Sequence, residues 1–171
     1  GYEGVEIAGN MGGMSPAELR DFLGDLDLGV AGSHIGIDAL EGNLTQVIDD
    51  NLTLGNQWIV CPWMPEDRRQ DADGWRQVAQ QMSEIGAQVK AAGLQLCYHN
   101  HSFEFQRFDG RTGFDIFYGA ADPDLVKAEI DTYWVQHGGE DPAAMVQRFA
   151  GRAPLVHLKD MTPGDSPTFT E

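Results

Sequence analysis

The chain has 171 residues and a formal net charge of −16, with 27 acidic and 11 basic side chains. Its hydrophobic share of 42% is ordinary for a soluble globular protein and supports one domain with a sizeable core. The charge argues against a nucleic-acid partner and against an anionic membrane surface, since both need clustered Lys and Arg. The sequence has no apolar run long enough to cross a bilayer.

Short apolar runs alternate with segments of helical periodicity along the whole chain. In chain order the predicted elements are strand 5–8, helix 16–26, strand 30–37, helix 44–52, strand 57–64, helix 73–92, strand 94–101, a short helix near 113–120, strand 126–133, helix 141–149 and strand 154–159. The first helix carries a capping-box pattern, in which Ser15 precedes Pro16 and Glu18 follows. The longest helix repeats apolar residues every three or four positions and ends before Gly93.

This alternation predicts an α/β fold with a parallel sheet and helical crossovers. The alternatives are a doubly wound sheet and a (β/α)8 barrel. No GxGxxG pattern follows the first strand, and polar residues gather at the carboxyl ends of several strands, where barrels place their active sites. We therefore predict a fold of the TIM-barrel type, which six strands leave incomplete, as a single partial domain over residues 1–171.

The two cysteines, Cys61 and Cys97, both fall within predicted strands. Two cysteines are too few for a disulfide framework, and the sequence has no CxxC pattern. We expect both to be reduced core residues, and the protein to be cytoplasmic.

Polar residues end the fourth predicted strand. Because side chains alternate along a strand, His99 and His101 are expected to point to the same side. Two imidazoles on one face can hold a divalent metal or move protons, and Glu104 lies just beyond them. The alternative for either histidine alone is a hydrogen-bonded structural residue.

The fifth predicted strand places Glu129, Asp131 and Tyr133 on one face. A carboxylate that points into a barrel is costly unless it is paired or bound to a metal. The alternative to a metal is an ion pair with Lys127 or Lys159, which is the stronger alternative for Glu129 and the weaker one for Asp131.

His157 and Lys159 share a face of the sixth predicted strand. Three neighbouring strands therefore end in side chains that can bind a metal or carry a proton. Mixed imidazole and carboxylate ligands suit Mn²⁺, Co²⁺, Fe²⁺ or Zn²⁺ better than Ca²⁺.

Four further residues are weaker candidates for contacts with a substrate. Glu6 follows the apolar start of the first strand, and His34 lies in the second, where a buried structural histidine is an equal alternative. Trp63 and Trp134 follow strands and are candidates to stack on a sugar ring, although core packing is the commoner fate of tryptophan.

Three motifs together resemble the sugar phosphate isomerase/epimerase family, which has a xylose isomerase-like TIM barrel. They are YHNHxxEF, EIDTYW followed by GGxDP, and HLKD. The opening GYEGVEIAG is similar to the family's second strand, so the resemblance spans nearly the whole chain in order. It implies a (β/α)8 barrel with one divalent metal at its C-terminal mouth.

The same resemblance implies metal ligands of the types Glu, Asp, His and Glu from four strands. Asp131 and His157 match the Asp and the His. Glu104 is the predicted first Glu, with His99 or His101 as the competing candidates. The resemblance places the last Glu on a final strand that this chain does not reach, and implies that strands one and eight are missing. We therefore expect either a homo-oligomer formed across exposed strand edges or further sequence in the protein.

The resemblance implies an isomerase or epimerase that transfers a proton next to the carbonyl of a small-molecule sugar, through an enediolate. Glu104, or His101 in its place, would remove the proton, and Lys159 would stabilise the oxyanion. Mn²⁺ is the preferred metal, with Co²⁺, Fe²⁺, Zn²⁺ and Mg²⁺ as alternatives. The rival functions are a dehydratase or lyase acting on a keto-inositol or keto-sugar at the same site, and a truncated, non-catalytic barrel.

Overall fold

The fold is built around a curled, six-stranded parallel sheet. The computed structural model describes residues 1–162, 164 and 168–170. The sheet contains β1 (Gly4–Ala8), β2 (Gly29–His34), β3 (Trp58–Cys61), β4 (Gln95–His99), β7 (Val126–Asp131) and β8 (Leu155–His157), in that spatial order. All neighbouring strands pair in parallel, and β1 and β8 form the two edges.

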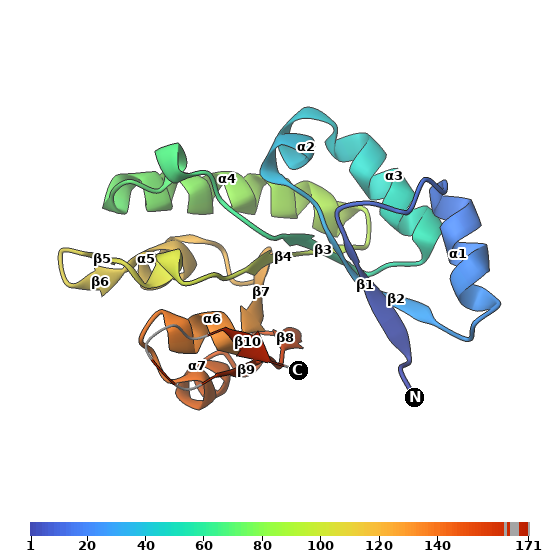
Figure 1. Cartoon of the computed structure of the whole chain (residues 1–171). Coiled ribbons are helices and arrows are strands. Elements are labelled where there is room, and N and C mark those ends of the chain that lie inside the picture. The colour runs from blue at the N-terminus through green and yellow to red at the C-terminus, as the bar shows by residue number, and fades with distance from the viewer. Residues whose placement is uncertain (163, 165–167, 171) are drawn as a thin grey trace.

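Helices connect these strands and lie outside the curve of the sheet (Figure 1). They are α1 (Pro16–Gly24), α2 (Ile37–Gly42), α3 (Leu44–Leu54), α4 (Ala72–Ala91), α5 (Gly113–Ala120), α6 (Thr132–His137) and α7 (Pro142–Arg148). Two short antiparallel pairs complete the described elements, β5 (Arg107–Phe108) with β6 (Arg111–Thr112), and β9 (Asp160–Met161) with β10 (Phe169–Thr170).

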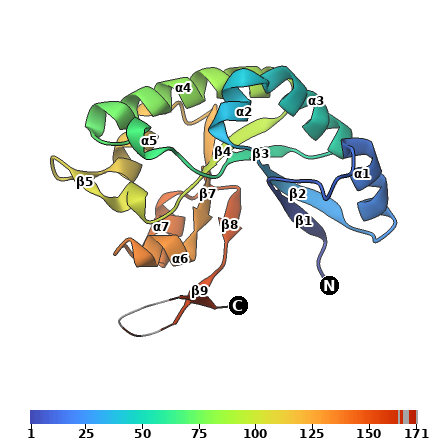
Figure 2. The ribbon, with the colours of Figure 1, turned by 45° about the horizontal axis from the view of Figure 1, so that its top comes forward.

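The strand order follows the chain order without the reversal that a doubly wound sheet requires. Figure 2 shows the sheet curling so that β1 and β8 approach each other across an open side. The predicted incomplete barrel is therefore confirmed: six parallel strands with outer helices form a half-barrel of the TIM-barrel type.

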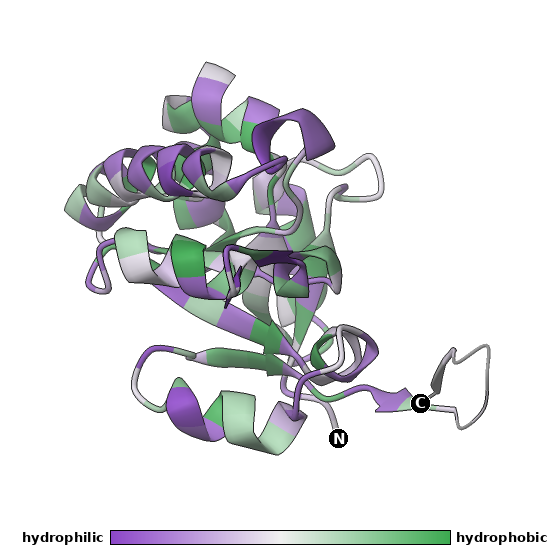
Figure 3. Ribbon diagram, turned by 90° about the vertical axis from the view of Figure 1, so that its left-hand side faces the viewer, coloured by the Kyte–Doolittle hydropathy of each residue, from purple (hydrophilic) through white to green (hydrophobic). Residues whose placement is uncertain are grey.

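The hydrophobic core lies between the outer face of the sheet and the helices. Strand residues such as Ile59, Leu96 and Ile130 are fully buried there, against Trp75 and Met82 from α4. Hydrophilic and hydrophobic residues alternate along the helices (Figure 3), as expected where one helical face packs on a sheet and the other meets solvent. The alternate residues of each strand are left to line the inner, concave face.

The predicted elements are found, but several strands end earlier than expected. The first helix has the predicted capping box, in which the Ser15 hydroxyl accepts from the Glu18 backbone N–H. The strand predicted for 126–133 ends at Asp131, because that residue caps α6 through its side chain. The prediction that Tyr133 shares a strand face with Asp131 was therefore wrong, since Tyr133 belongs to α6. Helices α2 and α6 were not predicted.

Both cysteines are buried and not disulfide-bonded. Burial raises the pKa of the Cys61 thiol to about 12, so this sulfur stays protonated at neutral pH. Within the described part of the chain, no helix combines the length and the apolar character that a membrane span requires.

Gly86 lets α4 pack closely against the segment before β7. A Cβ at this position would lie 2.5 Å from the carbonyl oxygen of Leu125, which is backbone and cannot rotate away. We expect Gly86→Ala to destabilise the protein by about 1–3 kcal/mol, although alanine favours helix. Gly24 is the matched control, because it is exposed and a Cβ there meets no described atom within 4 Å. Urea unfolding checks this, and a Gly86→Ala variant as stable as Gly24→Ala would contradict it.

Candidate active site

A cluster of imidazoles and carboxylates occupies the concave face near the carboxyl ends of the strands. Glu6 comes from β1, His34 from β2, His99 from β4, Glu129 and Asp131 from β7, and His157 from β8. Strand alternation explains their common direction, because Tyr98, which precedes His99, and Ile130, which lies between Glu129 and Asp131, are buried in the core on the opposite face. The cluster forms two groups that share His157 and whose ligand atoms lie within 4.8 Å of one another in each group.

The first group consists of His99, Asp131 and His157. Oδ2 of Asp131 lies 3.4 Å from Nε2 of His99 and 3.4 Å from Nδ1 of His157. Nζ of Lys159 lies 3.0 Å from the same oxygen. Burial opposes ionisation of Asp131, but contacts from His157 and His99 outweigh it and hold the pKa of this carboxyl well below its usual range. Asp131 is therefore a buried carboxylate facing several nitrogens.

Buried polar atoms without a directed hydrogen bond gather at this first group. Among the described residues they include both ring nitrogens of His99, Oδ2 of Asp131 and Nδ1 of His157. Oδ2 of Asp131 has ion-pair contacts, including the one from Lys159, but none of them has hydrogen-bond geometry. Buried polar groups are normally satisfied, so this concentration indicates a place for a ligand or ion. Two imidazoles and a carboxylate are a donor set that suits a divalent transition metal.

The second group consists of Glu6, His34, Glu129 and His157, and its members bond to one another. Nε2 of His157 lies 2.7 Å from Oε2 of Glu6, and Nε2 of His34 lies 3.0 Å from Oε2 of Glu129. His34 also lies 3.2 Å from Glu6. Carboxylates and imidazoles therefore alternate around this group, which joins the two edge strands to β2 and β7.

This alternation of charge shifts the pKa values in the second group. Burial opposes the charge on His34, but hydrogen bonds to Glu129 and Glu6 raise its pKa to about 9. Contacts with Asp131 and Glu6 raise the pKa of His157 to about 10. Burial raises the pKa of Glu129, whereas hydrogen bonds from the two histidines outweigh burial and hold the pKa of Glu6 well below its usual range. Without a bound ion, both histidines are therefore protonated at neutral pH.

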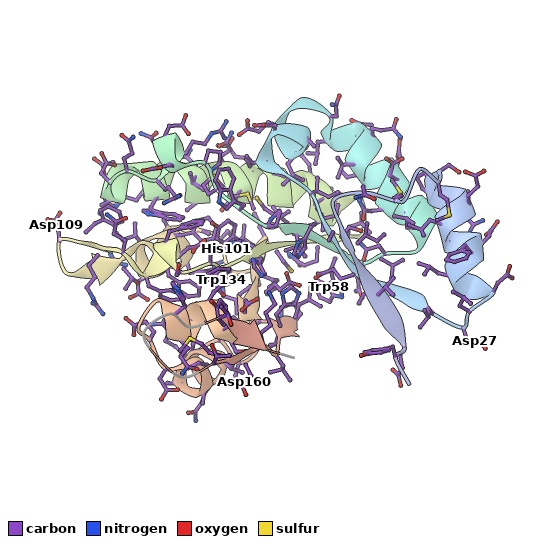
Figure 4. The ribbon with its side chains drawn as sticks, viewed as in Figure 1. Asp27, Trp58, His101, Asp109, Trp134 and Asp160 are labelled. Carbon is purple, nitrogen blue, oxygen red and sulfur yellow. The ribbon has the colours of Figure 1, made fainter. Side chains whose placement is uncertain are left out.

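An aromatic rim borders the first group at the mouth of the half-barrel. His101 lies beside Trp134 (Figure 4), with ring centroids 5.1 Å apart, and stacks on Phe103 at 5.5 Å. The guanidinium of Arg69 lies over the Phe103 ring, 3.7 Å from its centroid. Burial and the neighbouring His99 lower the pKa of His101 to about 4, so this imidazole is neutral at pH 7. The rim offers flat surfaces of the kind on which sugar rings stack.

Glu104 lies apart from both groups. It follows β4 in a short 3-10 helix (Phe103–Phe105) and is fully buried. Its carboxyl accepts hydrogen bonds from the Tyr98 hydroxyl at 2.7 Å and from the His101 backbone N–H at 2.8 Å. Burial raises its pKa to about 7, although these bonds oppose the shift. Glu104 thus holds the backbone of His101 and does not belong to either group of candidate ligands among the described residues.

Lys159 and Trp63, two further residues that the sequence singles out, lie in different surroundings. Lys159 contacts Asp131, and its backbone N–H donates to the Thr132 hydroxyl. Trp63 is 47% exposed beyond β3, and no described contact joins its side chain to either group. For Glu129, the sequence left an ion pair with Lys127 or Lys159 as the alternative to a metal, and in the structure its carboxylate instead contacts His34 at 3.0 Å. The signal was its position two residues before Asp131 on the same strand.

Residues 1–168 match the sequence model of the xylose isomerase-like TIM barrel family, and the chain belongs to this family. The chain is 26% identical to a sugar phosphate isomerase/epimerase from Parabacteroides distasonis of known structure, with a TM-score of 0.84. This match covers 97% of the present chain and 68% of the other. A D-psicose 3-epimerase structure shares the fold at 15% identity, with a TM-score of 0.69 over 92% of this chain and 63% of the epimerase.

Curated relatives include inosose dehydratases. The Clostridium beijerinckii enzyme is 30% identical over 88 residues, which is 51% of this chain and 28% of that protein. The Geobacillus kaustophilus enzyme is 25% identical over 187 aligned residues, which cover 94% of this chain and 58% of that protein. The chain therefore spans less than two thirds of the length of these relatives.

Proposed function

We propose that the protein is a divalent-metal-dependent isomerase or epimerase that acts on a sugar or keto-sugar by proton transfer next to a carbonyl. The observation that carries this proposal is the set of unsatisfied buried atoms on His99, Asp131 and His157. The similarity to the Parabacteroides distasonis sugar phosphate isomerase/epimerase supports it. Dehydration of a keto-inositol or keto-sugar is the second candidate, favoured by the inosose dehydratases among the relatives.

His99, Asp131 and His157 would hold the metal. When bound, a divalent ion such as Mn²⁺ acts as a Lewis acid that polarises a substrate carbonyl. The residues present fit this role, since imidazole and carboxylate donors from three strands converge there. Both ring nitrogens of His99, Oδ2 of Asp131 and Nδ1 of His157 have no hydrogen-bond partner among the described residues. The metal's identity among Mn²⁺, Co²⁺, Fe²⁺, Zn²⁺ and Mg²⁺ stays a prediction.

The protein's own residues would bind the substrate and move its proton. His101 is neutral, so one of its two ring nitrogens carries a lone pair that would accept a proton from carbon. Glu104 fixes the His101 backbone by accepting its N–H. Lys159 would stabilise the negative charge that develops on an enediolate, and Trp134 would stack on the sugar.

Solvent deuterium exchange tests this function. The chain, loaded with Mn²⁺, is incubated in D₂O with keto-inositols and with ketose and keto-sugar substrates. The reaction is then quenched, the metal is removed, and the products are analysed by NMR. Isomerisation, epimerisation and dehydration all begin with loss of the proton from the carbon next to the carbonyl. We expect deuterium at the carbon next to the carbonyl in an epimer or isomer, and loss of that hydrogen without its replacement in a dehydrated product. An epimer or isomer would support the first candidate, and loss of water the second. Metal binding without any exchange would favour the non-catalytic alternative.

A further inference from the structure

The two ring nitrogens of His157 face different groups. Nε2 lies 2.7 Å from Oε2 of Glu6, within hydrogen-bond distance. Nδ1 lies 3.4 Å from Oδ2 of Asp131 and has no hydrogen-bond partner among the described residues. Glu6 belongs to β1 and His157 to β8, so this hydrogen bond joins the two edges of the open sheet.

A histidine that ligates a metal through one nitrogen keeps a proton on the other. That N–H is commonly donated to a carboxylate, which fixes the orientation of the ring and makes the ligating nitrogen more basic. The carboxylate of Glu6 is placed to accept such a bond from Nε2. The nitrogen left to bind a metal is then Nδ1, which faces Asp131 and the first group.

Glu6 is itself held in place from two sides. His34 lies 3.2 Å from its Oε2, and His34 is fixed in turn by Glu129 at 3.0 Å. Gly32 makes room for the carboxyl, because a Cβ there would lie 2.8 Å from Oε1 of Glu6. A fixed, ionised carboxylate is an acceptor only, so it selects the N–H form at Nε2.

An ion bound between Glu6, His34, Glu129 and His157 is the competing interpretation of the same contacts. It would need the lone pair of Nε2 of His157, which the hydrogen bond to Glu6 engages as a donor. Among the described residues, four of the buried atoms without hydrogen-bond partners lie in the first group, on His99, Asp131 and His157. In the second group, Nε2 of His34 and of His157 face carboxylate oxygens within hydrogen-bond distance. The contacts therefore favour a hydrogen-bonded support over a second ion site.

We propose that Glu6 is a positioning residue that holds His157 with Nε2–H towards β1, so that Nδ1 is presented to a metal at His99 and Asp131. This inference rests on the metal site of the proposed function. It assigns a role in metal binding to a carboxylate from the opposite edge of the sheet, through its bond to His157.

The test compares Glu6→Gln with wild type in Mn²⁺ titrations followed by electron paramagnetic resonance. We expect one ion per chain in both, bound about 10- to 100-fold more weakly by Glu6→Gln, as is typical when the carboxylate partner of a ligating histidine is changed. Glu3→Gln is the control, since Glu3 is exposed just before the same strand and should bind as wild type does. Urea unfolding of the metal-free proteins shows whether each variant is folded.

Nitrogen NMR of the Zn²⁺-loaded chain supplies a readout that a merely structural role would not change. We expect the proton of His157 on Nε2, with Nδ1 unprotonated. Equal Mn²⁺ affinity in Glu6→Gln and wild type, two ions per chain, or a proton on Nδ1 would each overturn the role of Glu6 while leaving the enzyme proposal standing. Absence of Mn²⁺ binding by the wild type would overturn both.

Discussion

Replacing Asp131 with asparagine is expected to abolish tight binding of Mn²⁺ while preserving the helix that follows. The two carboxylate oxygens of Asp131 make different contacts. Oδ1 accepts from the Trp134 backbone N–H at 3.1 Å and caps α6, whereas Oδ2 faces His99, His157 and Lys159. Asparagine keeps the cap but removes the anionic ligand. We expect an affinity loss above about 100-fold, since even indirect partners of metal ligands contribute 10- to 100-fold.

Comparison of Asp131→Ala with Asp131→Asn separates the contribution of Asp131 to metal binding from its contribution to capping α6. Asp131→Ala should lose Mn²⁺ binding as Asp131→Asn does, and should also be less stable than Asp131→Asn by about 1 kcal/mol, because the cap of α6 is lost. Metal titration and urea unfolding of the metal-free variants measure both effects. Retention of near wild-type affinity by Asp131→Asn would place the metal elsewhere, and equal stability of the two variants would mean that the cap contributes little.

The second large effect is expected at Glu104, as a change in how stability depends on pH. Burial raises the pKa of Glu104 from 4.5 to about 7, a shift equivalent to roughly 3 kcal/mol. Because the folded protein holds this proton more tightly than the unfolded chain, the stabilisation is fully present below pH 4.5. It is lost as the pH rises through about 7, since the buried carboxyl must then ionise.

Glu104→Gln removes this titration. Between pH 4.5 and pH 8, we expect the free energy of unfolding of the variant to rise by roughly 3 kcal/mol relative to wild type. Urea unfolding of both proteins at each pH measures the difference between their free energies of unfolding. The contributions of other titrating groups are the same in both proteins and cancel in this difference. Glu84→Gln is the control for the substitution itself, because Glu84 is exposed on α4. A constant difference between Glu104→Gln and wild type across this range would show that Glu104 has an ordinary pKa.

Local sequence patterns predicted the order and type of most elements. Hydrophobic periodicity and helix capping depend on residues only a few positions apart in the sequence. The capping box at Ser15 and the helix over 113–120 could therefore be predicted from the sequence alone. The strand ends were less predictable. Asp131 was expected inside a strand, but its side chain satisfies the first turn of α6 and ends β7 there.

The sequence also predicted that candidate metal ligands would lie close together, because parallel strands bring their carboxyl ends to the same edge of a sheet. His99, Asp131 and His157 end three neighbouring strands. Their proximity could therefore be predicted without knowing how strongly the sheet curves. Glu104 shows the limit of that reasoning. Its place after β4 was predictable but its contacts were not: its carboxyl accepts a hydrogen bond from Tyr98, and it belongs to neither group of candidate ligands among the described residues.

The sequence by itself thus determined the alternation of strands and helices, the parallel sheet and the three strands that carry the candidate metal ligands. Only the tertiary structure decided the partners of these side chains. Glu6 and His157 lie 151 positions apart and on strands that do not pair, so no local pattern relates them. They meet because the twist of successive parallel strands curls the sheet until its two edges face each other across the half-barrel.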